Sequence, residues 1–264
     1  MTGKKEKSSY FNQFLKTSDL ARAVGIHENT VRRYVNWGLL PPVDRAPNGY
    51  RRFTRRHLDC LRLDRLIMEG GYPGRSIHQS GQQIIQCAVK DDWGGAIEQA
   101  YRHLANVKAE QASANAAIDL LERWAQGGGT DTTDRFLRIG ETARLLGVSQ
   151  DVLRNWERNG LLEVPRMQKN TYRQYGSHEI GRLRVIRMLV NAGYSLMAIL
   201  RMLLQLDRGD ARNLRYALDT PHPDEDVYMA SDRWLSTLDF EETRARKVID
   251  LIQSIIDDRS AVRS

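Results

Sequence analysis

The stretch NGYRRFTRRHLDCLRLDRL at residues 48–66 has a counterpart in NTYRQYGSHEIGRLRVIRM at residues 170–188, an offset of 122 residues. The correspondence extends without a gap over residues 14–77 and 136–199, where about 18 of the 64 aligned pairs are identical. An internal repeat that keeps its register over this length indicates that the chain holds two copies of one structural unit.

Each copy has the pattern of a short helix, a tight turn, a second short helix, a hairpin and a longer helix. In the first copy, TSDLARAV is followed by a turn at Gly25 and by NTVRRYVNW, which Gly38 ends. In the second copy Ser149 is a good N-cap for the second helix. The segments LLPPVDRAPNGYRRF and LLEVPRMQKNTYRQY each contain a proline, a turn and alternating aromatic and basic residues, which is typical of a two-stranded wing. We therefore expect a mainly α fold with two winged helix-turn-helix domains, a long helical connector and C-terminal helices.

The positive charge of the chain is concentrated in the two copies. The net charge is +7, yet residues 14–77 carry 12 basic against 6 acidic residues, and residues 136–199 carry 10 against 5. Residues 78–135 and 200–264 are each net −3. Basic domains joined by acidic connectors favour double-stranded DNA as the partner.

Composition excludes several other classes of protein. The hydrophobic fraction of 41% and charged fraction of 28% are those of a globular chain, and no apolar run is long enough for a membrane helix or signal peptide. A cytoplasmic protein at the nucleoid, without membrane association, is expected. Cys60 and Cys87 cannot build a four-cysteine cage, so we expect no metal and no cofactor. No catalytic constellation is present, so an enzyme is not expected.

The second helix of each copy is expected to enter the major groove, where base edges carry a distinct donor and acceptor pattern. On the wings, Arg51, Arg52 and Arg173 are expected to bind phosphates, with Arg45 and Lys169 at the tips. For Tyr50 and Tyr172, DNA contact and a ring covering the small core are both open. The side chains best placed to read bases are Asn29, Thr30 and Arg33 in the first copy and Gln150, Asp151 and Asn155 in the second.

Both copies resemble the MerR family of bacterial transcription regulators. In the first copy the resemblance lies in GLLPP, NGYRRF and LDRLIMEGGYPGRSI, in this order along the chain. In the second copy it is closer and lies in LRNWERNGLL and TYRQYGSHEIGRLRVIRMLVNAGYSLMAIL. The resemblance covers about half of the chain. It implies that Arg32 and Arg154 match an arginine of the family's second helix. Tyr34 and Trp156 match an aromatic residue that helps to hold the DNA backbone in that family, with packing against the wing as the alternative for Trp156. It also implies promoter DNA that is distorted for RNA polymerase, a further expected partner.

One family domain per subunit is usual, whereas this chain has two. The spacing of apolar residues predicts amphipathic helices over residues 97–125 and 240–258. The resemblance implies that the helix after the DNA-binding domain pairs with its counterpart from another subunit. We therefore favour an intramolecular pseudo-dimer, with a homodimer as the alternative. The expected segments are a basic tail 1–13, a first domain 14–90, a connector helix 91–126, a flexible linker 127–135, a second domain 136–205 and a C-terminal helical segment 206–264.

Three alternative functions follow from particular features. An architectural or excisionase-like DNA-bending factor would also use a small winged helix, although the long connector and C-terminal helices favour the regulator. A helical interaction scaffold would not need the wing arginines. The segment 218–238, with Tyr228 and Trp234 beside an acidic cluster, could form a pocket for a cationic small molecule.

Overall fold

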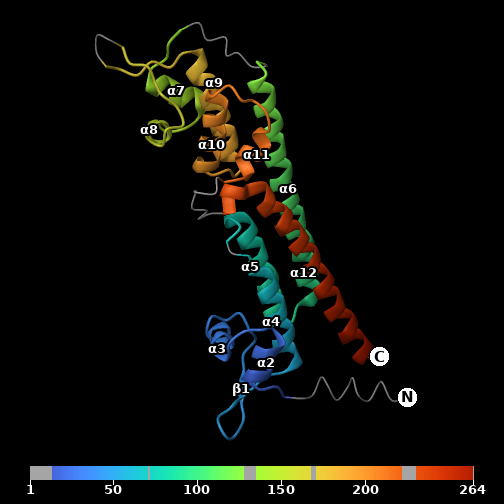
Figure 1. Ribbon diagram of the computed structural model, residues 1–264. Helices are drawn as coiled ribbons and strands as arrows, with labels where there is room; N and C mark the ends of the chain where they lie inside the picture. Colours follow the sequence, from blue (N-terminus) through green and yellow to red (C-terminus); the bar gives the residue numbers. More distant parts are fainter. Residues whose placement is uncertain (1–13, 71, 128–134, 168–170, 222–229, 264) are drawn as a thin grey trace. The chain divides into compact units, whose positions relative to one another are not determined.

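A computed structural model describes residues 14–70, 72–127, 135–167, 171–221 and 230–263 of the chain (Figure 1). The predicted tail 1–13, Lys169, Tyr228 and most of the predicted linker 127–135 lie outside the described residues. Helices dominate the described part, which confirms the predicted mainly α fold class. No helix in these ranges combines the length and the hydropathy that a membrane span requires. The chain divides into two compact units, unit 1 from residues 1–107 and 240–264 and unit 2 from residues 108–239.

Unit 1 contains the first helix-turn-helix and its wing. The turn at Gly25 has a φ of +66°, a left-handed conformation that glycine adopts without strain, and it lets two short helices pack closely. Two short antiparallel strands pair Asp44 with Arg52 and Arg45 with Arg51. In chain order the elements are α2 (Thr17–Ala23), α3 (Glu28–Asn36), β1 (Asp44–Arg45), β2 (Arg51–Arg52), α4 (Arg55–Ile67), α5 (Arg75–Val89) and the first part of α6 (Trp93–Ala125).

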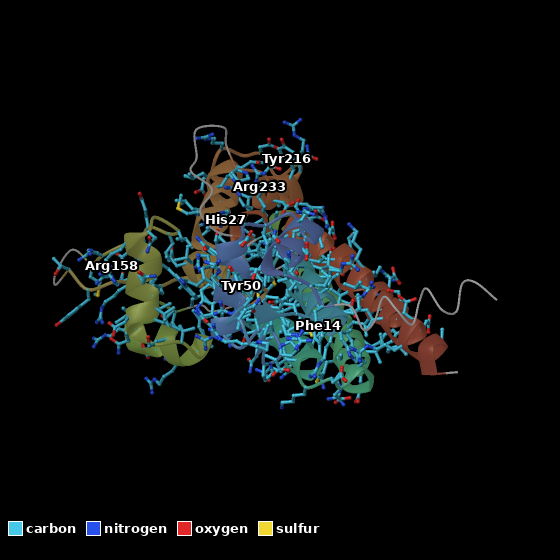
Figure 2. All side chains as sticks on the ribbon, turned by 90° about the horizontal axis from the view of Figure 1, so that it is seen from below. Phe14, His27, Tyr50, Arg158, Tyr216 and Arg233 are labelled. Atoms are coloured by element: carbon cyan, nitrogen blue, oxygen red, sulfur yellow. The ribbon has the colours of Figure 1, made fainter. Side chains whose placement is uncertain are left out.

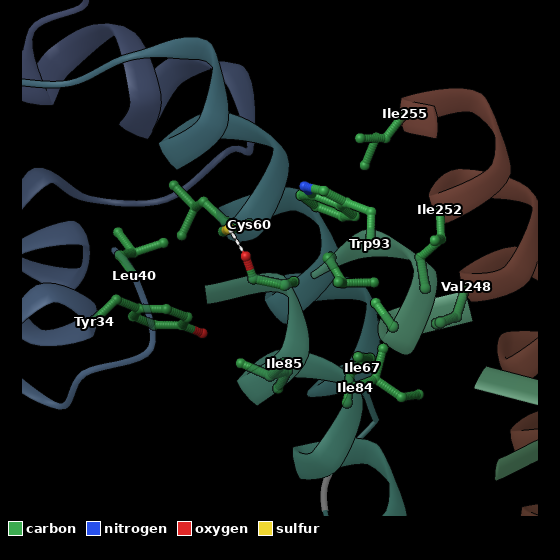
Figure 3. Close-up of a cluster of buried hydrophobic side chains, with 14 of the residues drawn as sticks. Tyr34, Leu40, Cys60, Ile67, Ile84, Ile85, Trp93, Val248, Ile252 and Ile255 are labelled. Atoms are coloured by element: carbon green, nitrogen blue, oxygen red, sulfur yellow. Dashed lines mark hydrogen bonds between the residues drawn. The ribbon is translucent and has the colours of Figure 1, made fainter. Parts of the chain in front are cut away.

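The core of unit 1 joins the helix-turn-helix to the end of the C-terminal helix α12 (Trp234–Arg263) (Figure 3). Val31 of α3 and Leu61 of α4 are fully buried. The Cys60 thiol donates to the carbonyl of Ala88 at 3.5 Å, which ties α4 to α5. The same cluster includes Trp93, Ala96 and Ala100 of α6 and Val248, Ile252 and Ile255 of α12.

Unit 2 repeats the arrangement with the second copy. The Ser149 hydroxyl accepts a hydrogen bond from the Val152 N–H at 3.2 Å, which confirms Ser149 as an N-cap. In the described part of the second wing, which leaves out residues 168–170, Arg166 and Arg173 form an antiparallel bridge. The elements are α7 (Ile139–Leu146), α8 (Gln150–Arg158), α9 (Ser177–Asn191), α10 (Leu196–Asp207), α11 (Leu214–Asp219), the 3-10 turn η1 (Ala230–Arg233), the later part of α6 and the start of α12.

The long helices α6 and α12 each contribute to both units. In unit 2, the later part of α6 buries Ala114, Ile118 and Leu121, and the Tyr194 hydroxyl donates to the Ala114 carbonyl at 3.4 Å. In unit 1, Arg259 of α12 pairs with Asp91 at 2.7 Å. Each helix-turn-helix therefore packs with the far end of the long helix that follows the other copy.

Candidate DNA-binding surface

We call the winged helix-turn-helix of residues 14–67 head 1 and that of residues 136–191 head 2. In head 1, His27 is the N-cap of α3, and its ring nitrogen accepts from the Asn29 N–H at 3.2 Å. Val31 points into the core, so the opposite face of α3 is exposed and carries Asn29, Arg32 and Arg33. Arg32 Nη1 donates to Asn29 Oδ1 at 3.2 Å, and these two polar groups form one surface unit.

Head 2 presents a matching face on α8. Leu153 is buried, while the Asp151 side chain is 88% exposed. Arg154 Nη1 lies 2.7 Å from Asp151 Oδ1, and Arg154 Nη2 donates to Gln150 Oε1 at 3.3 Å. Asn155 is half-buried, and its Oδ1 accepts from Asn159 Nδ2 at 3.1 Å. Both heads therefore place an arginine over a polar residue three positions earlier.

The two aromatic residues matched to the family's backbone-holding position lie mostly in the cores. Tyr34 is 7% exposed and Trp156 is 4% exposed. This burial favours the packing alternative that the sequence left open for Trp156. For Tyr34 it leaves little of the ring accessible to a phosphate.

Of the predicted cations of the first wing, Arg45 is exposed, while Arg51 and Arg52 are half-buried. Arg45 Nη1 donates to the Gly49 carbonyl at 3.1 Å across the turn, and Tyr50 is 75% exposed. The Arg52 guanidinium carbon lies 3.4 Å from the centre of the exposed Phe14 ring, a cation–π contact that orients this side chain. Figure 2 labels Phe14, His27 and Tyr50 on this domain.

The second wing is tied to the reading helix by an ion pair. Arg173 Nε donates to Glu157 Oε2 of α8 at 2.6 Å, and Arg166 lies 3.7 Å from the other carboxylate oxygen. The hydrogen bond to Glu157 raises the pKa of Arg173 above its ordinary value. Tyr172 is 60% exposed, with the Arg138 guanidinium 5.9 Å from its ring centre.

A buried histidine fixes the base of the first wing. His57 Nδ1 accepts from the Thr54 N–H at 3.1 Å, so the other ring nitrogen, Nε2, donates to the Pro42 carbonyl at 3.2 Å. Burial lowers the pKa of His57 despite this bond, which keeps the ring neutral. The neutral ring pins the start of the wing to the N-terminus of α4.

Sequence reasoning missed four side chains of these surfaces. Phe14 supports Arg52, Trp37 lies 4.6 Å beneath the Arg33 guanidinium, Arg138 faces Tyr172, and Glu157 holds Arg173. The repeat offered a signal for Phe14, because Phe136 is its identical counterpart and is also exposed. The other three have no identical counterpart, so the repeat could not single them out.

The sequence pattern of the MerR HTH family of regulatory proteins matches this chain twice, at residues 15–83 and 137–206. The two matches together cover more than half of the chain, and each spans one head and the segment that follows it. The chain belongs to the MerR family. This places the protein among DNA-binding transcription regulators, with two heads of the family in one chain.

Several known proteins are similar to parts of this MerR-family protein. The mercuric resistance operon regulatory protein of Bacillus cereus is 35% identical over 75 residues, 28% of this chain and 57% of that protein. A probable heavy metal-dependent transcriptional regulator of Haemophilus influenzae is 28% identical over 117 residues, 44% and 83% of the two chains. The HTH-type transcriptional regulator CueR of Escherichia coli O157:H7 is 29% identical over 105 residues, 40% and 68%. No solved structure matches the MerR-family chain.

Two of these names, those of the Bacillus cereus and Haemophilus influenzae proteins, refer to metals. Within the described ranges of this MerR-family chain, no group of three or more His, Cys, Asp or Glu side chains is arranged to hold a metal ion. Cys60 is buried in the core of unit 1, and burial raises the pKa of its thiol to about 12. Cys60 is therefore a protonated core residue.

Proposed function

We propose that one chain binds one DNA operator with both heads and regulates transcription from the promoter that contains it. The observation that carries this proposal is that each head packs with the end of the long helix that follows the other head in the chain, which we call the exchange of the long helices. Head 1 packs with the end of α12, and head 2 packs with the end of α6. In a homodimer the pairing helix would come from a second subunit, whereas here the same chain supplies it.

The apolar surface that each head buries supports this stoichiometry. Ile252 and Ile255 of α12 are buried in the core of unit 1, and Ile118 and Leu121 of α6 are buried in unit 2. Apolar stripes that are covered inside the chain need no second subunit to remove them from water. A homodimer with four heads remains the alternative outcome of the test below.

Differences between the heads support an operator with two unlike halves. Asn29 and Arg33 of head 1 occupy the positions of Asp151 and Asn155 in head 2. These side chains have different donors and acceptors, so the two heads should prefer different base pairs. The proposed base-reading residues are Asn29, Thr30, Arg32, Arg33, Gln150, Asp151, Arg154 and Asn155.

Phosphate contact is proposed for the wings, because a guanidinium has five N–H donors and the contact that holds each arginine leaves donors for DNA. Arg45 and Arg52 are held in place by Gly49 and Phe14, and Arg173 by Glu157. Tyr50 and Tyr172 are exposed enough to reach the backbone beside them. Arg51 completes the first wing, and Lys169 belongs to the same proposal for the second wing.

Regulation is proposed to act through a distorted promoter that RNA polymerase then reads, at the nucleoid in the cytoplasm. Distortion without any effect on transcription would instead indicate an architectural factor. Transcription in vitro from DNA that carries the operator, with and without the protein, separates the two functions. A change in transcript level that Arg51→Ala abolishes supports the regulator.

Mass in solution tests the stoichiometry. Sedimentation of the protein at micromolar concentration, free and on a single operator selected from random DNA, should give one chain of 30.3 kDa per duplex. The selected operator should contain two different halves. A stable species of twice that mass with four protected half-sites, or a perfect palindrome as the best operator, contradicts the pseudo-dimer.

A further inference from the structure

The two heads carry different chemical groups at one equivalent, exposed position of their reading helices. Asn29 and Asp151 are both the second residue of their helix, after the N-caps His27 and Ser149. Each accepts a hydrogen bond from the arginine one turn later, at 3.2 Å in head 1 and 2.7 Å in head 2. The two residues thus share their helix position and their arginine partner, and they differ in the group that faces the DNA, an amide in Asn29 and a carboxylate in Asp151.

We propose that Asp151 specifies a cytosine in one half of the operator and that Asn29 specifies an adenine at the equivalent base pair of the other half. This inference rests on the proposed function, because it assigns bases to heads that bind one DNA site.

The carboxylate of Asp151 has only acceptors. In the major groove a carboxylate can accept from the N4 amino group of cytosine. Adenine also offers an amino group, but its N7 acceptor lies beside that group and repels a carboxylate. Among the described residues, Arg154 engages Oδ1, and no hydrogen bond is found at Oδ2. One oxygen of an 88% exposed side chain is therefore left to accept from a base.

The amide of Asn29 has both an acceptor and two donors. Arg32 donates to Oδ1, which leaves the second lone pair of Oδ1 and both hydrogens of Nδ2. An amide in this state can accept from adenine N6 and donate to adenine N7 in the same plane. The same backbone position therefore fits adenine in head 1 and cytosine in head 2.

A negative charge on a helix facing DNA phosphates needs compensation. Arg154 supplies it, since its Nη1 lies 2.7 Å from the carboxylate, and the N-terminus of α8 also favours an acidic residue. These two roles alone would explain Asp151 without any base contact. The experiment must therefore separate base preference from helix stability and from the general effect of charge.

The test exchanges the two groups. Operators selected with the wild-type protein are remade with each of the four base pairs at every position of each half, and dissociation constants are measured at fixed salt. Asp151→Asn should move the preference at one base pair of one half from cytosine to adenine, with a change of about tenfold in the ratio of the two affinities. Asn29→Asp should make the reverse change at the equivalent base pair of the other half.

Glu163→Gln serves as the charge-matched control, because Glu163 is exposed in head 2 and lies outside α8. It should alter affinity for all base pairs by the same factor. An Asp151→Asn variant that behaves in the same way, on a wild-type background with clear base preference, overturns this inference and leaves the proposed function standing. A wild-type protein that binds every duplex alike overturns both. Circular dichroism and melting temperature establish that each variant is folded, and the reciprocal variant gives an independent reading.

Discussion

Arg173 of the second wing and Glu157 of α8 form an ion pair with a separation of 2.6 Å, whereas their counterparts Arg51 and Val35 in head 1 cannot form one. Arg173 is identical in position and type to Arg51, yet its guanidinium is already bound within the protein. The same arginine therefore serves different purposes in the two heads.

Arg51→Ala and Arg173→Ala should have different effects because of that ion pair. Arg51→Ala should weaken DNA binding and leave the melting temperature almost unchanged. Arg173→Ala should also lower the free energy of unfolding by about 1–3 kcal/mol, since it leaves the half-buried Glu157 with the more distant cation Arg166 at 3.7 Å. Thermal denaturation and DNA titration of both variants check this. Equal melting temperatures would show that the ion pair does not stabilise head 2.

Asp64 should destabilise the protein at neutral pH. It is fully buried in α4, neither carboxylate oxygen has a hydrogen-bond partner in the described structure, and burial raises its pKa to about 7. Asp64→Leu keeps the side-chain shape and removes the charge, so it should stabilise the protein by roughly 2–4 kcal/mol at pH 8. Head 2 has the apolar Ile186 at this position.

The pH dependence of that gain has a definite sign. Between pH 4 and 7 the folded state holds a proton on Asp64 that the unfolded state has released, so the wild type loses stability as pH rises. The difference between Asp64→Leu and wild type should therefore grow from pH 4 to 7 and stay constant above. Urea denaturation at several pH values measures it, and a difference independent of pH would show that Asp64 is not buried as a carboxyl group.

A core substitution in α12 should loosen head 1, and one in α6 should loosen head 2, because these are the heads that the two helices pack against. Ile252→Ala in α12 and Ile118→Ala in α6 remove fully buried side chains, at a cost of about 2–5 kcal/mol. Hydrogen exchange should then increase in α2 to α5 for Ile252→Ala and in α7 to α10 for Ile118→Ala. If each variant instead loosened the head that precedes its own helix, the exchange of helices would be wrong.

The wings predict a strong dependence of DNA affinity on salt. If six or more phosphates are neutralised, the logarithm of the association constant should fall with the logarithm of salt concentration at a slope of about −5 or steeper. Arg45→Ala with Arg52→Ala should flatten the slope by about 2, because both cations are held on the first wing, Arg45 in an exposed position and Arg52 in a half-buried one. A slope near zero in the wild type would contradict phosphate binding by the wings.

Short-range patterns in the sequence were sufficient to predict the helices of both heads. The positions of α3 and α8 follow from a turn glycine and apolar residues at helical spacing, and the N-cap Ser149 is a further signal for α8. The exposed faces with Asn29 and Asp151 follow from the same spacing. The Glu157–Arg173 pair could not be predicted, since its members are 16 residues apart on different elements and lack a counterpart in head 1.

The sequence by itself determined that the chain has two winged helix-turn-helix domains, because an uninterrupted repeat carries the local signals for caps, turns and amphipathic helices twice. Only the tertiary structure decided how deeply residues that are identical in the two copies are buried. Tyr72 and Tyr194 are identical in the repeat, yet Tyr72 is 59% exposed, while Tyr194 is 3% exposed and donates to Ala114 of α6. The physical reason is that burial depends on which distant segment covers a residue. That choice was made by the packing of α6 and α12, which lie outside the repeat.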